Sequence, residues 1–127
     1  MFSITTAEES MHIQQWTSFL LRNDRSIQIF VDAMLIDGQW ITTSGLPLYD
    51  PVSPVAESGK CAVMSNDHGG MKLIQANCGR NIDSFCEFVN NSKVETKDKE
   101  VVCTKQKDIH DSDGKYIKTA CLVEYAA

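Results

Sequence analysis

Residues 46–64 decide the fold of this chain, and they read Leu-Pro-Leu-Tyr-Asp-Pro-Val-Ser-Pro-Val-Ala-Glu-Ser-Gly-Lys-Cys-Ala-Val-Met. Pro47, Pro51 and Pro54 each fix φ and remove a backbone donor, so this stretch cannot form a helix interior or a central strand. The apolar run at its end, Cys61–Met64, indicates a short buried strand. The sequence therefore predicts a long irregular loop that leads into a strand. Loops of this length in compact domains are usually functional or disordered.

One helix and several short strands are predicted around this loop. Thr6 and Glu9 have the spacing of a capping box, and Ile13 and Trp16 follow at helical spacing, which predicts a helix through about residue 22. Beyond it, short runs of strand-forming residues are separated by turn dipeptides such as Asp37-Gly38 and Asp113-Gly114. The predicted strands are residues 27–31, 39–43, 61–64, 71–74, 85–89, 101–103 and 120–123.

The composition favours a folded chain and excludes two classes of partner. The chain has 127 residues, of which 43% are hydrophobic and 23% are charged, close to the averages of globular domains. Its net charge of −5 argues against a nucleic-acid-binding domain, which needs a basic face to neutralise phosphates. No stretch approaches the roughly 18 apolar residues that a membrane span needs. The first residues lead directly into the predicted helix and show no signal-peptide pattern.

Five cysteines in a chain of this length point to an oxidising compartment. The number is odd, so one thiol would be left without an internal partner. Cys103 and Cys121 flank the predicted C-terminal hairpin and can pair across it. No spacing typical of a zinc site, a phosphate-binding loop or a nucleophile elbow occurs, so the sequence predicts neither a metal centre nor an enzyme. Cysteine-dependent catalysis at Cys86 remains a distant third class of function beside the two described below.

An ordered set of motifs over residues 2–89 resembles the second half of a C-type lectin-like domain. The set comprises Gly38-Gln39-Trp40, Ser44-Gly45-Leu46-Pro47-Leu48, Cys61-Ala62-Val63-Met64, Gly69-Gly70, Cys78 and Phe85-Cys86-Glu87, with Phe30-Val31-Asp32-Ala33 where the family usually shows Trp-Ile-Gly-Leu. The resemblance implies an α+β fold with small antiparallel sheets, one clear helix and a long irregular loop region stapled by disulfides. It also implies that Cys61 and Cys78 form the loop-stapling disulfide.

The chain departs from the family at its start. The strand and first helix that normally open the fold have no counterpart, nor does the cysteine there that would bond to Cys86. Cys86 is therefore expected to be unpaired, or to pair with Cys103 or Cys121. On this interpretation, residues 1–89 are an N-terminally incomplete C-type lectin-like domain. Residues 90–127 are a polar linker followed by a hairpin-like tail.

The calcium ligands of the family are not present. Its Glu-Pro-Asn or Gln-Pro-Asp motif aligns with Ser53-Pro54-Val55, and its Trp-Asn-Asp motif aligns with Met71-Lys72-Leu73. Calcium needs about six to eight oxygen ligands, whereas the ammonium of Lys72 would repel a cation. We therefore expect no metal and no cofactor.

The resemblance implies a secreted or extracellular module that recognises a glycan or an extracellular protein through its long loop. Calcium-independent carbohydrate binding is the first expectation, and a protein–protein interaction module or secreted effector without sugar binding is the alternative. The expected ligand-binding residues are Ser53, Glu57, Asn66, Asp67 and Lys72. A sequon at Asn90 would accept a glycan if the chain is secreted.

Overall fold

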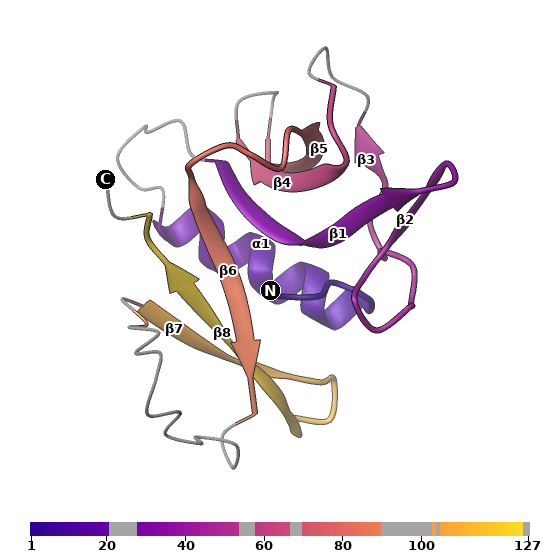
Figure 1. The fold of residues 1–127 in the computed structure, drawn as a ribbon. Coiled ribbons are helices and arrows are strands. Elements are labelled where there is room, and N and C mark those ends of the chain that lie inside the picture. The colour runs from indigo at the N-terminus through magenta and orange to yellow at the C-terminus, as the bar shows by residue number, and fades with distance from the viewer. Residues whose placement is uncertain (21–27, 54–57, 67–69, 90–102, 104, 126–127) are drawn as a thin grey trace, which may run out of the picture.

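A computed structural model describes residues 1–20, 28–53, 58–66, 70–89, 103 and 105–125 of the chain. One helix and eight strands occur in these ranges (Figure 1). They are α1 (Ala7–Leu20), β1 (Gln28–Ile36), β2 (Gln39–Ile41), β3 (Val52–Ser53), β4 (Cys61–Ser65), β5 (Lys72–Ala76), β6 (Asp83–Phe88), β7 (Lys105–His110) and β8 (Tyr116–Val123). The α+β class predicted from the sequence is confirmed.

The strands form one mixed sheet, with α1 packed on one of its faces (Figure 1). The order is β3-β5-β4-β1-β6-β8-β7, and β2 pairs with β1 outside this path. The β1–β6 and β3–β5 pairings are parallel, and the others are antiparallel. The expectation of small antiparallel sheets is therefore wrong, because the strands form one larger sheet in which two pairings are parallel. The physical reason is β1, which is long enough to pair with β4 along one edge and with β6 along the other, and so joins both sets of strands.

The helix begins as its sequence predicts and packs its apolar side on the sheet. The Thr6 hydroxyl accepts a bond from the Glu9 amide at 3.2 Å, and a Glu9 carboxylate oxygen accepts one from the Thr6 amide at 3.1 Å. This is the reciprocal pairing of a capping box. Ile13 is fully buried, and the Trp16 ring lies 5.6 Å from the ring of Phe85 in β6. These contacts fix the helix against the middle of the sheet.

The segment before the helix fills a gap inside the sheet. The parallel pairing of β1 with β6 covers only two positions, ending at Phe30 and Ser84. Beyond it, the Phe2 amide donates to the Phe85 carbonyl at 2.7 Å, and the Asp32 amide donates to the Phe2 carbonyl at 2.8 Å. The Phe2 side chain is fully buried. Phe2 therefore bridges the two strands where they separate.

The C-terminal hairpin belongs to the same sheet and core as the preceding residues. Strand β8 pairs with β6 along five positions, and Ile109, Ala120 and Leu122 pack in one core with Ile13 and Phe85. The boundary drawn from the sequence after residue 89 thus falls between strands of one sheet. The lysine-rich composition that indicated a linker continues into β7, which is an exposed edge strand, and edge strands are commonly charged.

A buried ion-pair cluster centred on Lys118 ties these parts together. The side chain comes from β8, and the residue is only 6% exposed. Its ammonium donates to the Ser3 carbonyl at 2.7 Å and to a Glu87 carboxylate oxygen at 2.9 Å, and it forms an ion pair with Glu9. The same nitrogen lies 4.3 Å from the centre of the Phe2 ring. These partners offset the high cost of burying a charge.

The Glu9 carboxylate is the matching anion of this cluster. Burial by itself would raise the pKa of Glu9, but the hydrogen bond from Lys118, the bond from the Thr5 backbone and the charge of Lys118 outweigh it. The pKa of Glu9 in the folded protein consequently lies below its ordinary value of 4.5. The ionised form is therefore the one that stabilises the fold.

We expect Lys118→Ala to lower the free energy of unfolding by about 3–5 kcal/mol, because it leaves the buried Glu9 carboxylate without its cation. Urea unfolding followed by circular dichroism measures this loss. Lys115→Ala, at an exposed turn position, is the control and should change stability by no more than about 0.5 kcal/mol. Equal stability of the two variants would contradict the proposed importance of the cluster.

The lowered pKa of Glu9 also predicts acid sensitivity. A group whose pKa is lower in the folded state stabilises the protein above its unfolded pKa, near 4.5, and loses this contribution as the pH falls through the folded pKa. Unfolding free energies measured from neutral to acidic pH should therefore decline below about pH 4.5. Glu9→Gln should reduce that decline. If the unfolding free energy of Glu9→Gln declined in acid as much as that of the unmodified chain, groups other than Glu9 would be responsible for the acid sensitivity.

Candidate functional site

A cleft of about 210 Å³ opens between α1 and the sheet edge formed by β3, β4 and β5. Four chain segments contribute to it: α1, the loop before β3, strand β3, and the β4–β5 hairpin with the residue before β5. The lining residues are Gln14, Asp50, Pro51, Ser53, Met64, Met71, Lys72 and Leu73.

The floor of the cleft is apolar and is fixed by strand pairing. Met64 in β4 lies directly opposite Leu73 in β5, and the two residues are 1% and 3% exposed. Thr17 in α1 also contacts Met64, since its hydroxyl lies 3.4 Å from the Met64 sulfur. The short strand β3 is parallel to β5, with Val52 aligned with Leu73, and Ser53 in this strand lines the cleft. The floor is therefore a rigid part of the sheet.

Polar groups from three segments lie at the cleft. The Ser10 hydroxyl in α1 donates to the Asp50 carboxylate at 2.5 Å and accepts a bond from the Gln14 amide nitrogen at 2.8 Å. These bonds fasten the loop before β3 to the helix. The Lys72 side chain is exposed, so groups of opposite charge, Asp50 and Lys72, line one cleft. Such a set can donate and accept hydrogen bonds around an uncharged polar ligand.

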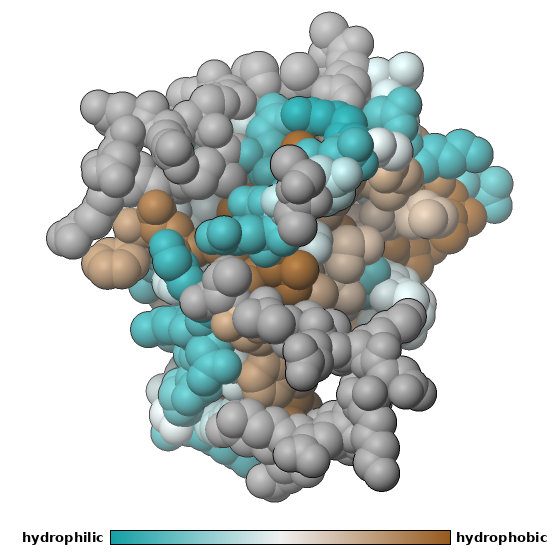
Figure 2. Space-filling view, turned by 60° about the vertical axis from the view of Figure 1, so that its left-hand side comes forward, coloured by the Kyte–Doolittle hydropathy of each residue, from teal (hydrophilic) through white to brown (hydrophobic). Residues whose placement is uncertain are grey.

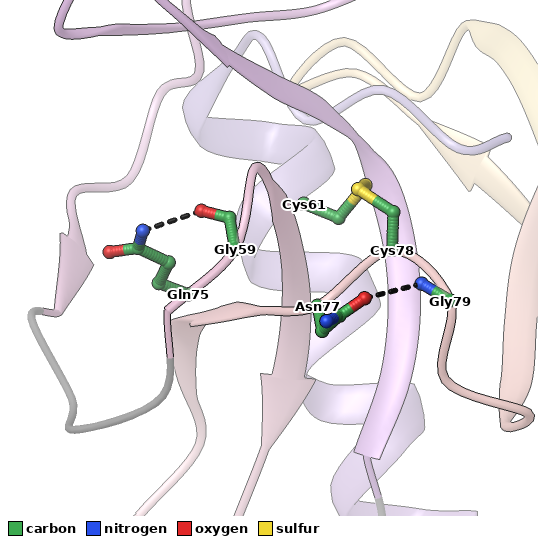
Figure 3. Close-up of a disulfide and its surroundings, with 6 residues drawn as sticks. All are labelled: Gly59, Cys61, Gln75, Asn77, Cys78 and Gly79. Atoms are coloured by element: carbon green, nitrogen blue, oxygen red, sulfur yellow. Dashed lines mark hydrogen bonds between the residues drawn. A yellow bond between two sulfur atoms is a disulfide. The ribbon is translucent and has the colours of Figure 1, made fainter.

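The opposite end of the β4–β5 hairpin is stapled by the Cys61–Cys78 disulfide (Figure 3). The Cα atoms of the two cysteines are 5.2 Å apart. Gln75 donates to the Gly59 carbonyl at 2.5 Å, and the Gly79 amide donates to the Asn77 side chain at 2.8 Å. The staple and these bonds fix the hairpin that carries Lys72 and the cleft floor at its other end.

The structure brings together part of the predicted site. Ser53 and Lys72 both line the cleft. Asn66 is half-buried one residue after β4 and is not among the described residues that line the cleft. Glu57 and Asp67 lie outside the residues that the structure describes, as does the sequon asparagine Asn90.

Sequence reasoning missed several lining residues. Asp50 and Pro51 belong to the proline-containing stretch that indicated a functional loop. The position of the charged residue Asp50 next to a proline in that loop could have identified it as a candidate site residue. Gln14 lies on the helix, and Met64 belongs to a predicted buried strand. Neither carries a local signal, because their place in the cleft depends on how α1 packs against the sheet.

Both disulfides considered in the sequence analysis are present. Cys61 bonds Cys78, Cys103 bonds Cys121, and Cys86 is a free, half-buried thiol. In the part of the chain that the structure describes, no three His, Cys, Asp or Glu side chains come close enough together to hold a metal ion. Within the same ranges, no helix has the length and apolar character that a membrane crossing requires.

Searches against protein-family models, curated proteins and solved structures find no match to this chain.

Gly59 is expected to tolerate no side chain. A Cβ at this position would lie 2.2 Å from the Ala76 carbonyl oxygen, which is backbone and cannot move independently of β5. Gly59→Ala should therefore lower the free energy of unfolding by about 1–3 kcal/mol. In the control Gly79→Ala, the new methyl group meets only the Asn77 side chain at 3.3 Å, so thermal or urea unfolding should show a smaller loss. A larger loss for Gly79→Ala would contradict the close approach at Gly59.

Proposed function

We propose that this protein is an extracellular recognition module, similar to C-type lectin-like domains, that binds a carbohydrate without calcium. The observation that carries the proposal is the cleft, whose lining combines the polar residues Asp50, Ser53 and Lys72 with the apolar residues Met64 and Leu73. Apolar floors with a few polar groups are typical of small-molecule sites. A sugar ring presents hydroxyl groups at its edge and C–H groups on its faces, which suits this arrangement.

The size of the cleft limits the ligand. Its volume of about 210 Å³ is below the roughly 300–1,000 Å³ of pockets that enclose drug-sized ligands. A single sugar ring, such as the terminal residue of a glycan, is the appropriate size class. Asp50 accepts hydrogen bonds from its hydroxyl groups, and Lys72 and Ser53 donate to their oxygens. This binding mode needs no bound ion.

The cysteine pairing supports the extracellular part of the proposal. Disulfides persist in oxidising compartments and are rare in the cytosol. The Cys61–Cys78 bond is the one that the resemblance to C-type lectin-like domains implies.

Exposed apolar side chains favour a second candidate, a protein-interaction module without sugar binding. Met34 and Ile36, two positions apart on β1 and hence on one side of the strand, are 48% and 47% exposed. Tyr49, next to the cleft residue Asp50, is 55% exposed. Figure 2 shows that hydrophobic side chains reach the surface beside hydrophilic ones on the face that it views. Apolar surface of this kind is used in protein recognition.

A glycan array followed by titration calorimetry tests the first candidate. The expected result is binding to glycans that survives chelation with EDTA. Lys72→Ala should weaken it about 10- to 100-fold, since a hydrogen bond from a charged donor is worth about 1.5–3 kcal/mol. Lys107→Ala, on the exposed edge strand β7, is the matched control and should bind as the unmodified chain does.

Three results would contradict the proposal. Loss of binding in EDTA would show that a cation is needed. Equal effects of Lys72→Ala and Lys107→Ala would place the sugar outside the cleft. Absence of any glycan signal from the folded protein, together with binding to an extracellular protein that excess monosaccharide does not compete away, would establish the second candidate instead.

A further inference from the structure

The free thiol of Cys86 lies on the sheet face away from the helix. Side chains alternate along a strand, and the neighbours of Cys86 in β6 point toward the helix. Phe85 is fully buried against Trp16, and Glu87 binds the Lys118 ammonium. Cys86 therefore projects from the opposite face, together with Ser84.

A disulfide lies on this same face, directly across from the thiol. The β6–β8 register aligns Cys86 with Cys121, and Cys121 is the half of the Cys103–Cys121 disulfide that belongs to the sheet. Directly opposite residues of an antiparallel pair point to the same face, with Cβ atoms about 4.5–5.5 Å apart. A disulfide requires about 3.5–4.5 Å between Cβ atoms, so a small local adjustment brings the thiol into bonding range of Cys121.

We propose that Cys86, Cys103 and Cys121 form an intramolecular thiol–disulfide exchange site. The Cys86 thiolate attacks the Cys121 sulfur, so the Cys86–Cys121 bond forms as the Cys121–Cys103 bond breaks. The electron pair of the broken bond leaves on the Cys103 sulfur, which takes up a proton. One disulfide and one thiol exist before and after the step, so it consumes no oxidant or reductant.

Burial determines which sulfur is attacked. Cys121 is 1% exposed, whereas Cys103 is half-buried. Attack on Cys103 would release a thiolate on the buried Cys121, and a buried charge without a partner is costly. Attack on Cys121 releases the thiolate on Cys103, which is the less buried of the two residues. The β6–β8 register and the burial of Cys121 therefore both favour formation of the Cys86–Cys121 bond.

The other disulfide is excluded by its position. Cys61 begins β4, and β1 lies between β4 and β6 in the sheet. The Cys86 thiol therefore has only the Cys103–Cys121 disulfide beside it among the residues that the structure describes.

Thiol–disulfide exchange changes which parts of the chain the disulfide joins. The Cys103–Cys121 bond spans 18 positions and closes the C-terminal hairpin on itself. The Cys86–Cys121 bond would join β8 to β6, and so would attach the hairpin covalently to the strand that carries Phe85 and Glu87. The site thus selects between two covalent forms of one fold. This inference does not depend on the ligand proposed for the cleft.

Differential alkylation of the full chain tests the exchange. The folded protein is incubated in mildly alkaline buffer without added thiol, quenched in acid, unfolded, and labelled with N-ethylmaleimide under mildly acidic conditions that stop exchange. Peptide mass spectrometry then locates the label. The expected result is label shared between Cys86 and Cys103, with Cys61, Cys78 and Cys121 unlabelled. Label confined to Cys86, or found on Cys61 or Cys78, would overturn the proposal.

A displaced thiol provides the matched control. The double variant Cys86→Ser/Ser84→Cys moves the thiol two positions along the same face, opposite Val123. The introduced cysteine is then a diagonal neighbour of Cys121, with about 7–8 Å between the two Cα atoms, so the label should stay on the introduced thiol. As a second test, Cys103→Ser leaves Cys86 and Cys121 as thiols, and oxidised glutathione should join them into one disulfide. Label on Cys103 in the double variant, or two persistent thiols in Cys103→Ser, would refute the register-based mechanism.

Discussion

The Lys118 ammonium is the point at which the separate segments of this protein meet. It binds Glu9 at the start of the helix, Glu87 in β6 and the Ser3 carbonyl, and it lies over the Phe2 ring. The partners come from the N-terminal segment, the start of the helix and β6, and Lys118 itself comes from the C-terminal hairpin. A buried cation with several partners has few alternative positions, because the loss of any one partner leaves its desolvation less well compensated. The arrangement of helix, N-terminal segment and C-terminal hairpin therefore depends on this one charge.

The same constraint extends to the candidate binding cleft. Glu9 is held by Lys118, and the next residue, Ser10, bonds the Asp50 carboxylate at the cleft. Gln14, one helical turn further on, bonds Ser10 and lines the cleft. Because the helix is fixed against the sheet, the polar groups that it carries or bonds at the cleft are fixed as well. The cleft floor is fixed separately by the β4–β5 register. A site built on a helix and strands is held more precisely than one built on loops alone.

The cysteines act at a more local level than the ion-pair cluster. Each disulfide spans 17 or 18 positions, and each closes a hairpin region of the sheet. Cross-links of this span stabilise mainly by restricting the unfolded chain. They therefore leave the joining of the hairpins to strand pairing, to Phe2 and to Lys118. Cys86 lies where β6 meets β8, which makes it the one cysteine placed to join the C-terminal hairpin covalently to the strands before it.

Local features followed from the sequence by itself. These features depend on neighbouring residues, and they are the capping box of Thr6 and Glu9, the turn at Asp113-Gly114 and the strand at Cys61. The order of the motifs along the chain pointed to Ser53 and Lys72, which line the cleft. The tertiary structure decided the single mixed sheet, the insertion of Phe2, and the placing of Asp50 and Gln14 in the cleft. Periodicity and turn chemistry act over a few residues, whereas Glu9 and Lys118 lie at opposite ends of the chain. No local pattern specifies such a pair, because it forms only when folding brings two distant surfaces together.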